Sequence, residues 1–146
     1  MRYLADSTLL VDYFRRRDEA REYIEKARRG EIILFISTVT EAELWVGIRT
    51  DSQLESYVAL LEEIKKIHVN SKIAREAGSI WKQCSHYMGR DSEKSPEEDL
   101  RHLPDALIAA TAKTRNMPLI TRDYSHFRQL EANGLIDLEL YLQDSQ

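Results

Sequence analysis

Short runs of apolar residues alternate along the chain with longer segments in which apolar residues recur at helical spacing. Five runs have the length and composition of buried strands, and they occupy residues 2–5, 31–37, 66–69, 117–121 and 135–140. Strands that alternate with helices in this way predict a parallel sheet covered by helices on both faces, which is an α/β fold of three layers.

The segments between these runs carry recognisable helix signals. One predicted helix spans 18–29 and ends at Gly30. Another begins at Ser71 and places a core-facing stripe at Ile73, Ala77, Ile80, Cys84 and Tyr87. A hydroxyl residue followed three positions later by Glu predicts a helix start, and this pattern occurs at Thr38 with Glu41, Ser52 with Glu55 and Ser95 with Glu98. Residues 89–99 combine turn formers with charge and predict an exposed loop.

The composition is typical of one folded domain spanning residues 1–146, with 42% hydrophobic and 32% charged residues. Cys84 is the only cysteine, which excludes an internal disulfide and a zinc site built from cysteines. Strand-like sequence begins at Arg2, and no apolar run approaches the roughly 20 residues of a membrane span. We therefore expect a cytoplasmic protein that does not enter a membrane.

Four acidic residues lie where predicted strands end or where the next helices begin. Asp6 and Asp123 follow the first and fourth strands, Asp105 opens the helix before the fourth strand, and Glu43 lies about one and a half turns into the helix after the second. Taken singly, the three aspartates are explained as helix caps and Glu43 as part of a solvated face. Parallel sheets, however, bind ligands beyond the C-terminal ends of their strands. If the first and fourth strands are neighbours, the four carboxylates converge at that edge.

Converging carboxylates require a cation or bound protons, because two unit charges about 4 Å apart repel by about 4 kcal/mol at an effective dielectric constant of 20. Oxygen ligands without a matching set of Cys or His residues favour Mg²⁺ or Mn²⁺. Such ions acidify a bound water and offset charge on a phosphodiester that is being cleaved. Ser7, Thr8 and Thr121 are candidate hydroxyl partners for the carboxylates, with Ser7 expected to hold Asp6.

The net charge of −4 argues against a protein that coats nucleic acid through bulk electrostatics, although local basic groups remain. Candidate RNA-binding residues are Arg122, Arg15, Arg16 and Arg101. Arg122 is the strongest, because its neighbour Asp123 places it near the predicted edge and guanidinium suits phosphate. A run of three Arg residues such as that at 15–17 is more often a solvated surface than a binding site. His68, His86 and His126 lack ligand spacing with one another, and we interpret them as structural or surface groups.

The segments that carry the four acids resemble the PIN-domain family, and specifically the VapC-type ribonuclease toxins of toxin–antitoxin pairs. The resemblance covers nearly the whole chain and rests on "YLADSTLLVDYFRR", "ISTVTEAELWVGI" and "DALIAATAKTRNMPLITRDYSHF". It implies that the metal ligands are Asp6, Glu43, Asp105 and Asp123, with Thr121 as the hydroxyl beside the last. The family's usual Thr-Asn after the first Asp is Ser7-Thr8 here, and we expect that Thr8 does not reproduce both hydrogen-bonding ends of an Asn amide.

This resemblance also implies a fold and an activity. It implies a central five-stranded parallel sheet with the first strand in the middle, next to the fourth. It further implies a homodimeric endoribonuclease that uses Mg²⁺ or Mn²⁺ to cleave structured RNA such as tRNA or rRNA. A small VapB-like antitoxin would inhibit it by occupying the active groove. Two alternatives stay open: a PIN-fold nuclease that processes RNA without an antitoxin, and a PIN-fold module that binds RNA or protein without turnover.

Overall fold

A five-stranded, all-parallel sheet forms the centre of the molecule, which a computed structural model describes over residues 1–141. Its strands are β1 Arg2–Ala5, β2 Ile33–Ser37, β3 Lys65–Ile67, β4 Leu119–Thr121 and β5 Leu138–Leu140. They are arranged in the order β3-β2-β1-β4-β5. The expectation that the first strand is central and adjacent to the fourth is therefore confirmed.

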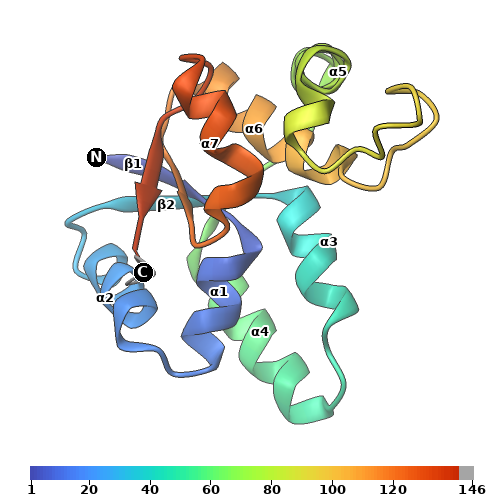
Figure 1. Cartoon of the computed structure of the whole chain (residues 1–146). Coiled ribbons are helices and arrows are strands. Elements are labelled where there is room, and N and C mark those ends of the chain that lie inside the picture. Colours follow the sequence, from blue (N-terminus) through green and yellow to red (C-terminus); the bar gives the residue numbers. More distant parts are fainter. Residues whose placement is uncertain (142–146) are drawn as a thin grey trace.

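Helices cover both faces of this sheet (Figure 1). They are α1 Ser7–Phe14, α2 Asp18–Arg28, α3 Thr38–Val46, α4 Asp51–Glu63, α5 Ser71–Cys84, α6 Leu103–Arg115 and α7 Tyr124–Ala132, and a 3₁₀ turn spans Ser85–Tyr87. In Figure 1, α1, α2 and α4 lie on one side of the strands, and α5, α6 and α7 lie on the other. Within residues 1–141, none of the helices is both long enough and apolar enough to cross a membrane.

The central strand supplies both halves of the core because successive side chains of a strand point to opposite faces. Leu4 packs with buried residues of α5, α6 and α7. Its neighbours Tyr3 and Ala5 pack with those of α1, α2 and α4. The structure is therefore the three-layer α/β/α arrangement that the pattern of strands and helices predicts.

Register brings the C-terminal ends of the three central strands together. Leu4 of β1 pairs with Phe35 of β2 and with Leu119 of β4. Immediately after β1, the backbone N–H of Asp6 donates to the carbonyl oxygen of Ile120 at 3.1 Å. Asp6 is thereby held beside the end of β4.

Two predicted helix starts were placed slightly too late along the chain. The N-cap of α3 is Ser37, whose hydroxyl accepts from the backbone N–H of Val39, one residue before the predicted cap. The capping box of α4 is formed by Thr50 and Gln53, two residues earlier than predicted. Several hydroxyl residues stand close together at these points, and the turn of the backbone decides which one caps the helix.

The region after α5 also differs in part from the prediction. Glu98 accepts hydrogen bonds from the backbone N–H and from the hydroxyl of Ser95, but the backbone N–H of Glu98 donates to the Ser95 carbonyl oxygen and not to its hydroxyl. These bonds close a turn, and no helix follows. Tyr87 is exposed, whereas the other four residues of the predicted stripe are buried. Because α5 ends at Cys84 and the chain tightens into the 3₁₀ turn, Tyr87 leaves the face that the helical repeat would give it.

Candidate active site

Asp6 ends β1, caps α1 and is nearly buried, with 6% of its surface exposed. Its Oδ1 accepts hydrogen bonds from the backbone N–H of Thr8 at 3.0 Å and from the Thr8 hydroxyl at 2.5 Å. Its Oδ2 accepts from the Thr121 hydroxyl at 2.5 Å. Burial raises the pKa of Asp6 to about 6, while the hydrogen bonds from Thr121 and Thr8 act in the opposite direction. The carboxylate is thus oriented by neutral groups.

Thr8 uses its single hydroxyl both as a donor and as an acceptor. It donates to Asp6 and accepts from the backbone N–H of Arg122 at 3.0 Å. The expectation that Thr8 lacks the two hydrogen-bonding functions of an amide is therefore wrong, since one hydroxyl can fill both roles. The hydroxyls that bind Asp6 belong to Thr8 and Thr121, and not to the expected Ser7, which opens α1.

Thr121 connects Asp6 with Asp123 through its hydroxyl. It is fully buried at the end of β4, donates to Asp6 and accepts from the backbone N–H of Asp123 at 2.8 Å. Asp123 stands at the N-cap position of α7 but makes no side-chain cap bond there. Its Oδ1 accepts instead from the Ser125 hydroxyl at 3.0 Å. Helix capping thus explains Asp6 in part and leaves the position of the Asp123 carboxylate unexplained.

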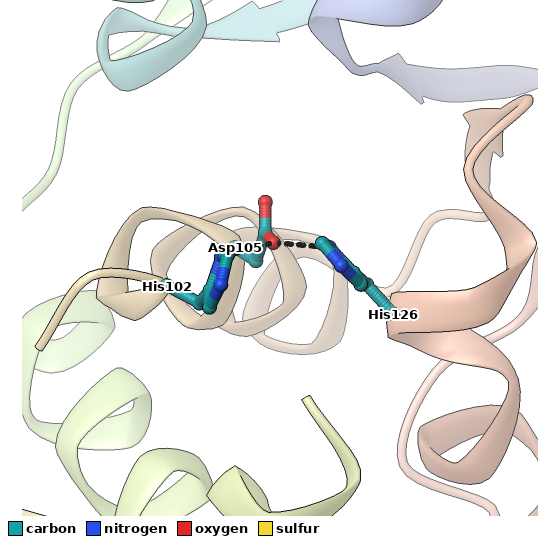
Figure 2. A group of neighbouring side chains, drawn as sticks. All are labelled: His102, Asp105 and His126. Atoms are coloured by element: carbon teal, nitrogen blue, oxygen red, sulfur yellow. Dashed lines mark hydrogen bonds and ion pairs between the residues drawn. The ribbon is translucent and has the colours of Figure 1, made fainter. Parts of the chain in front are cut away.

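Asp105 lies in the first turn of α6 and hydrogen bonds to His126 of α7, with 2.7 Å between Asp105 Oδ2 and His126 Nδ1 (Figure 2). The same His126 nitrogen lies 3.3 Å from Asp123 Oδ2, so this imidazole stands between the two acids. Burial raises the pKa of Asp105, and His126 opposes that shift.

His126 is more than the structural or surface group that we expected. It lies three residues after Asp123, and His102 lies three residues before Asp105. Residues at this spacing share one face of a helix. The spacing of three residues between each histidine and its acid is the local signal in the sequence for this pairing.

Glu43 approaches this group from α3, which packs against α1 and α6. Its pKa is raised to about 7 by loss of solvation and by the negative charges of Asp105 and Asp6. Glu43 itself is exposed to solvent. The structure thus gathers all four predicted acids at one edge of the sheet.

The donor set suits a hard divalent cation. Within residues 1–141, neither Asp6 nor Glu43 forms an ion pair with Lys or Arg, and the ion-pair partners of Asp105 and Asp123 are histidines. Oxygen donors that repel one another without a cationic side chain match the ligand preference of Mg²⁺ and Mn²⁺. The residues present therefore fit the metal that the carboxylates imply.

The side chain of Arg122 binds Asp12, which is not one of the four predicted metal ligands. Its Nε donates to Oδ2 of Asp12 at 2.8 Å, and the Tyr141 hydroxyl donates to the same oxygen at 2.6 Å. Arg17 Nε lies 3.5 Å from the other oxygen of Asp12. Asp12, on α1, is fully buried, so this network joins α1 to the segment after β4.

The other basic candidates lie apart from Asp6 or are already paired. Arg15 and Arg16 follow α1, and an eight-residue helix separates its ends by about 12 Å. Arg101 binds Asp99 through two contacts, at 2.9 and 2.7 Å. These arginines do not converge on the four acids.

Comparison with known proteins agrees with this geometry. A family model for the PIN domain matches residues 3–133, a range that contains all four acids. Ribonuclease VapC10 of Mycobacterium tuberculosis is 32% identical over 128 residues, which are 88% of this chain and 87% of that protein.

Solved toxin–antitoxin complexes share the fold. The VapBC2 complex of Rickettsia felis, bound to a DNA fragment from its promoter, matches with a TM-score of 0.73 at 19% identity, covering 96% of this chain and 98% of the matched chain. A toxin–antitoxin complex from Klebsiella pneumoniae matches with a TM-score of 0.70 at 23% identity, covering 97% and 98%. The chain therefore belongs to the PIN domain family and is of the VapC type.

Proposed function

We propose that this protein is a cytoplasmic endoribonuclease that depends on Mg²⁺ or Mn²⁺, cleaves structured RNA such as tRNA or rRNA, and acts as the toxin of a VapBC-type pair. The observation that carries the proposal is the convergence of Asp6, Glu43, Asp105 and Asp123 at one sheet edge without a Lys or Arg partner in residues 1–141. Membership of the family and the ribonuclease name of the relative support the same reaction.

In this proposal the four acids hold the cation, and residues 1–146 act as one nuclease domain. A bound divalent cation supplies an acidified water and offsets charge on the scissile phosphate. Thr8 and Thr121 fix both oxygens of Asp6, so this ligand is positioned before the cation arrives. The pKa of Glu43 is raised by burial and by the charges of Asp105 and Asp6, and a bound cation would offset that repulsion and favour the carboxylate.

RNA would approach over the edge that carries these acids. Arg122 has a side chain that is 38% exposed while Asp12 holds its Nε, so the rest of the guanidinium can meet a phosphate. Arg101, Arg15 and Arg16 are further candidates for backbone contacts along the same RNA, at greater distance from the acids.

A VapB-like antitoxin and a second copy of the chain are the proposed partners. The solved neighbours include toxin–antitoxin complexes, which supports the first. On α3, beside Glu43, Trp45 and Val46 are 53% and 80% exposed. Large apolar side chains next to the acids suit coverage by a protein partner.

The catalytic part of the proposal is tested by incubating the purified protein with total tRNA and rRNA in Mg²⁺, in Mn²⁺ and in EDTA. We expect cleavage with either metal and none with EDTA. Asp123→Asn should abolish cleavage, whereas Glu62→Gln, which alters an exposed acid on α4, should leave it unchanged. Equal cleavage in EDTA, or by Asp123→Asn, would exclude the proposed mechanism.

The partner is tested by expression in cells with and without the product of the adjacent reading frame. We expect the protein alone to arrest growth and co-expression to restore it. A metal-dependent ribonuclease whose expression leaves growth unaffected would favour the RNA-processing alternative. Metal binding without any cleavage would favour the module that binds without turnover.

A further inference from the structure

His102, Asp105 and His126 form a compact group at the start of α6 and α7. Their ligand atoms all lie within 4.8 Å of one another. Figure 2 shows Asp105 between the two imidazoles, with His102 on the same helix as Asp105 and His126 reaching across from α7. Two of the three residues are nitrogen donors, so this group differs in chemistry from the four carboxylates.

The spacing of these donors is close to that of a zinc site. Zn²⁺ binds nitrogen and oxygen at about 2.0–2.1 Å in tetrahedral geometry, which places neighbouring ligand atoms about 3.3 Å apart. Here Asp105 Oδ2 lies 2.7 Å from His126 Nδ1 and 3.9 Å from His102 Nδ1. The required separation falls between these two distances, and the remaining pair, His102 and His126, also has ligand atoms within 4.8 Å of each other.

The backbone packs closely behind His102. Gly89 has a φ of +90°, and a Cβ at this position would lie 3.0 Å from Cδ2 and 3.2 Å from Nε2 of His102. Glycine therefore allows the chain to lie directly against this imidazole, which restricts its movement. His102 approaches Asp105 through its other nitrogen, Nδ1.

The group of His102, Asp105 and His126 is partly exposed to solvent, and a further carboxylate lies beside it. The side chains of His102, Asp105 and His126 are 34%, 23% and 30% exposed, so an ion can reach them. Asp123 Oδ2 lies 3.3 Å from His126 Nδ1 and adds negative charge nearby.

We propose that His102, Asp105 and His126 bind a transition metal that prefers nitrogen ligands, of which Zn²⁺ is the representative, and that this ion inhibits the enzyme. Imidazole suits Zn²⁺ and Ni²⁺, whereas Mg²⁺ requires oxygen ligands. Asp105 belongs both to this group and to the four acids. An ion bound by the two histidines therefore withdraws Asp105 from the site for Mg²⁺. The inhibitory consequence rests on the proposed ribonuclease activity, but the metal site does not.

The metal site is tested by titrating untagged protein with Zn²⁺ and, separately, with Mg²⁺ at about pH 7.5. Calorimetry should show one Zn²⁺ site that is tighter than the site for Mg²⁺. His102→Ala and His126→Ala should each weaken Zn²⁺ binding at least about tenfold, since even the outer partners of metal ligands are worth 10–100-fold in affinity. His68→Ala removes an exposed histidine elsewhere and should bind as the wild type does.

Either of two results would contradict the proposed Zn²⁺ site. One is a wild-type protein that binds Zn²⁺ no tighter than Mg²⁺, and the other is unchanged Zn²⁺ affinity in both His102→Ala and His126→Ala. Circular dichroism and thermal unfolding show whether each variant is folded, and His102→Gln provides a second variant that keeps a polar side chain. Neither readout uses RNA, so the site is decided even if the protein cleaves nothing.

The inhibitory role is tested by adding Zn²⁺ to a cleavage reaction that contains a fixed excess of Mg²⁺. Half-inhibition of the wild type should need more Zn²⁺ when the fixed Mg²⁺ concentration is raised, because the two ions compete for Asp105. His102→Ala should need at least about tenfold more Zn²⁺ for the same inhibition. Equal sensitivity of the two proteins, or stimulation of the wild type by Zn²⁺, would contradict competition at Asp105. Absence of cleavage in every metal would refute the ribonuclease proposal alone.

Discussion

Asp6 and Asp12 are both buried aspartates at either end of the first helix, yet their surroundings differ in charge. Asp12 is fully buried and is bound by Arg122 and Tyr141, with Arg17 beside its other oxygen. Asp6 is 6% exposed and is bound by two hydroxyls and a backbone N–H. Only Asp12 has cationic side chains that compensate its charge.

This difference separates a residue that stabilises the fold from one that is ready for a ligand. A buried carboxylate is costly unless it is paired and hydrogen bonded. For Asp12 the chain supplies the pairing, whereas for Asp6 it supplies orientation by neutral groups, which is the arrangement that the proposed metal site requires. Arg122 connects the two environments, because its side chain binds Asp12 and its backbone N–H binds Thr8.

Removing Asp12 should have the largest effect. Asp12→Ala leaves Arg122 and Tyr141 without their shared partner, and breaking a buried pair in this way costs about 3–5 kcal/mol of unfolding free energy. Urea denaturation at neutral pH measures the loss. Glu62→Ala, which removes an exposed acid, should change stability by less than about 0.5 kcal/mol. A loss below about 1 kcal/mol for Asp12→Ala would show that the network does not stabilise the fold.

Removing the charge of Asp6 should instead affect metal binding and activity. In Asp6→Asn the side chain keeps its size, so we expect a folded protein that is at least as stable as the wild type without metal. Cleavage and Mn²⁺ affinity should fall at least about 100-fold, the upper range for the loss of a group that merely supports a ligand. Wild type should gain about 2.7 kcal/mol of stability when Mn²⁺ is present at 100 times its dissociation constant.

The readout is urea denaturation with and without Mn²⁺, beside the RNA cleavage assay. Asp6→Asn should show no Mn²⁺-dependent gain at the concentration that stabilises the wild type. If it gains as much as the wild type does, Asp6 is not a metal ligand, and the contrast between the two aspartates loses its functional meaning.

The pH dependence of stability should reveal the uncompensated charge directly. An unfolded aspartate has a pKa near 3.9, whereas that of Asp6 in the folded protein is about 6. The folded state therefore binds more protons between these values, and stability falls as pH rises through that window. Relative to Asp6→Asn, metal-free wild type should lose about 2 kcal/mol between about pH 4.5 and about pH 6.5.

Denaturation of both proteins at several pH values, with chelator present, tests this expectation. Subtracting the Asp6→Asn curve removes the contributions of acids that do not interact with Asp6. The charge of Asp6 raises the pKa of Glu43, so the loss of this interaction changes the difference in the same direction. A difference that stays constant with pH, or that rises with pH, would mean that the folded protein does compensate the Asp6 charge.

The contrast also shows what the sequence could predict. Each of the five predicted strands overlaps an observed one, and β1 has the predicted bounds, because apolar runs and strand edges are local patterns. The same reasoning placed the four acids at the C-terminal edge. The sheet order that brings β1 beside β4 was available only through the family resemblance.

Long-range pairing was beyond the reach of sequence spacing. Arg122 and Asp12 are 110 positions apart, so a predicted RNA-binding arginine could not be recognised as the partner of a buried acid. His126 and Asp105 are 21 positions apart and come from different helices. Thr8 was judged by comparison with an amide, and only its contact with the backbone of Arg122 shows that its hydroxyl fills both roles.

Thr8 offers the smallest and most selective test of the contrast. Thr8→Val keeps the shape but removes the hydroxyl that donates to Asp6 and accepts from the Arg122 N–H. An unsatisfied buried group costs about 1–3 kcal/mol. We expect a stability loss at the lower end of this range, about 1 kcal/mol. Asp6 Oδ1 still accepts from the backbone N–H of Thr8, and the exposed Arg122 N–H can bind water instead. Mn²⁺ affinity should fall about tenfold, since Asp6 loses one of its two orienting hydroxyls.

The matched control is Ser7→Ala, which should change neither stability nor Mn²⁺ affinity, because the observed hydroxyl donors to Asp6 are Thr8 and Thr121. If Ser7→Ala weakens Mn²⁺ binding as much as Thr8→Val does, the carboxylate is not oriented by the hydrogen bonds described here.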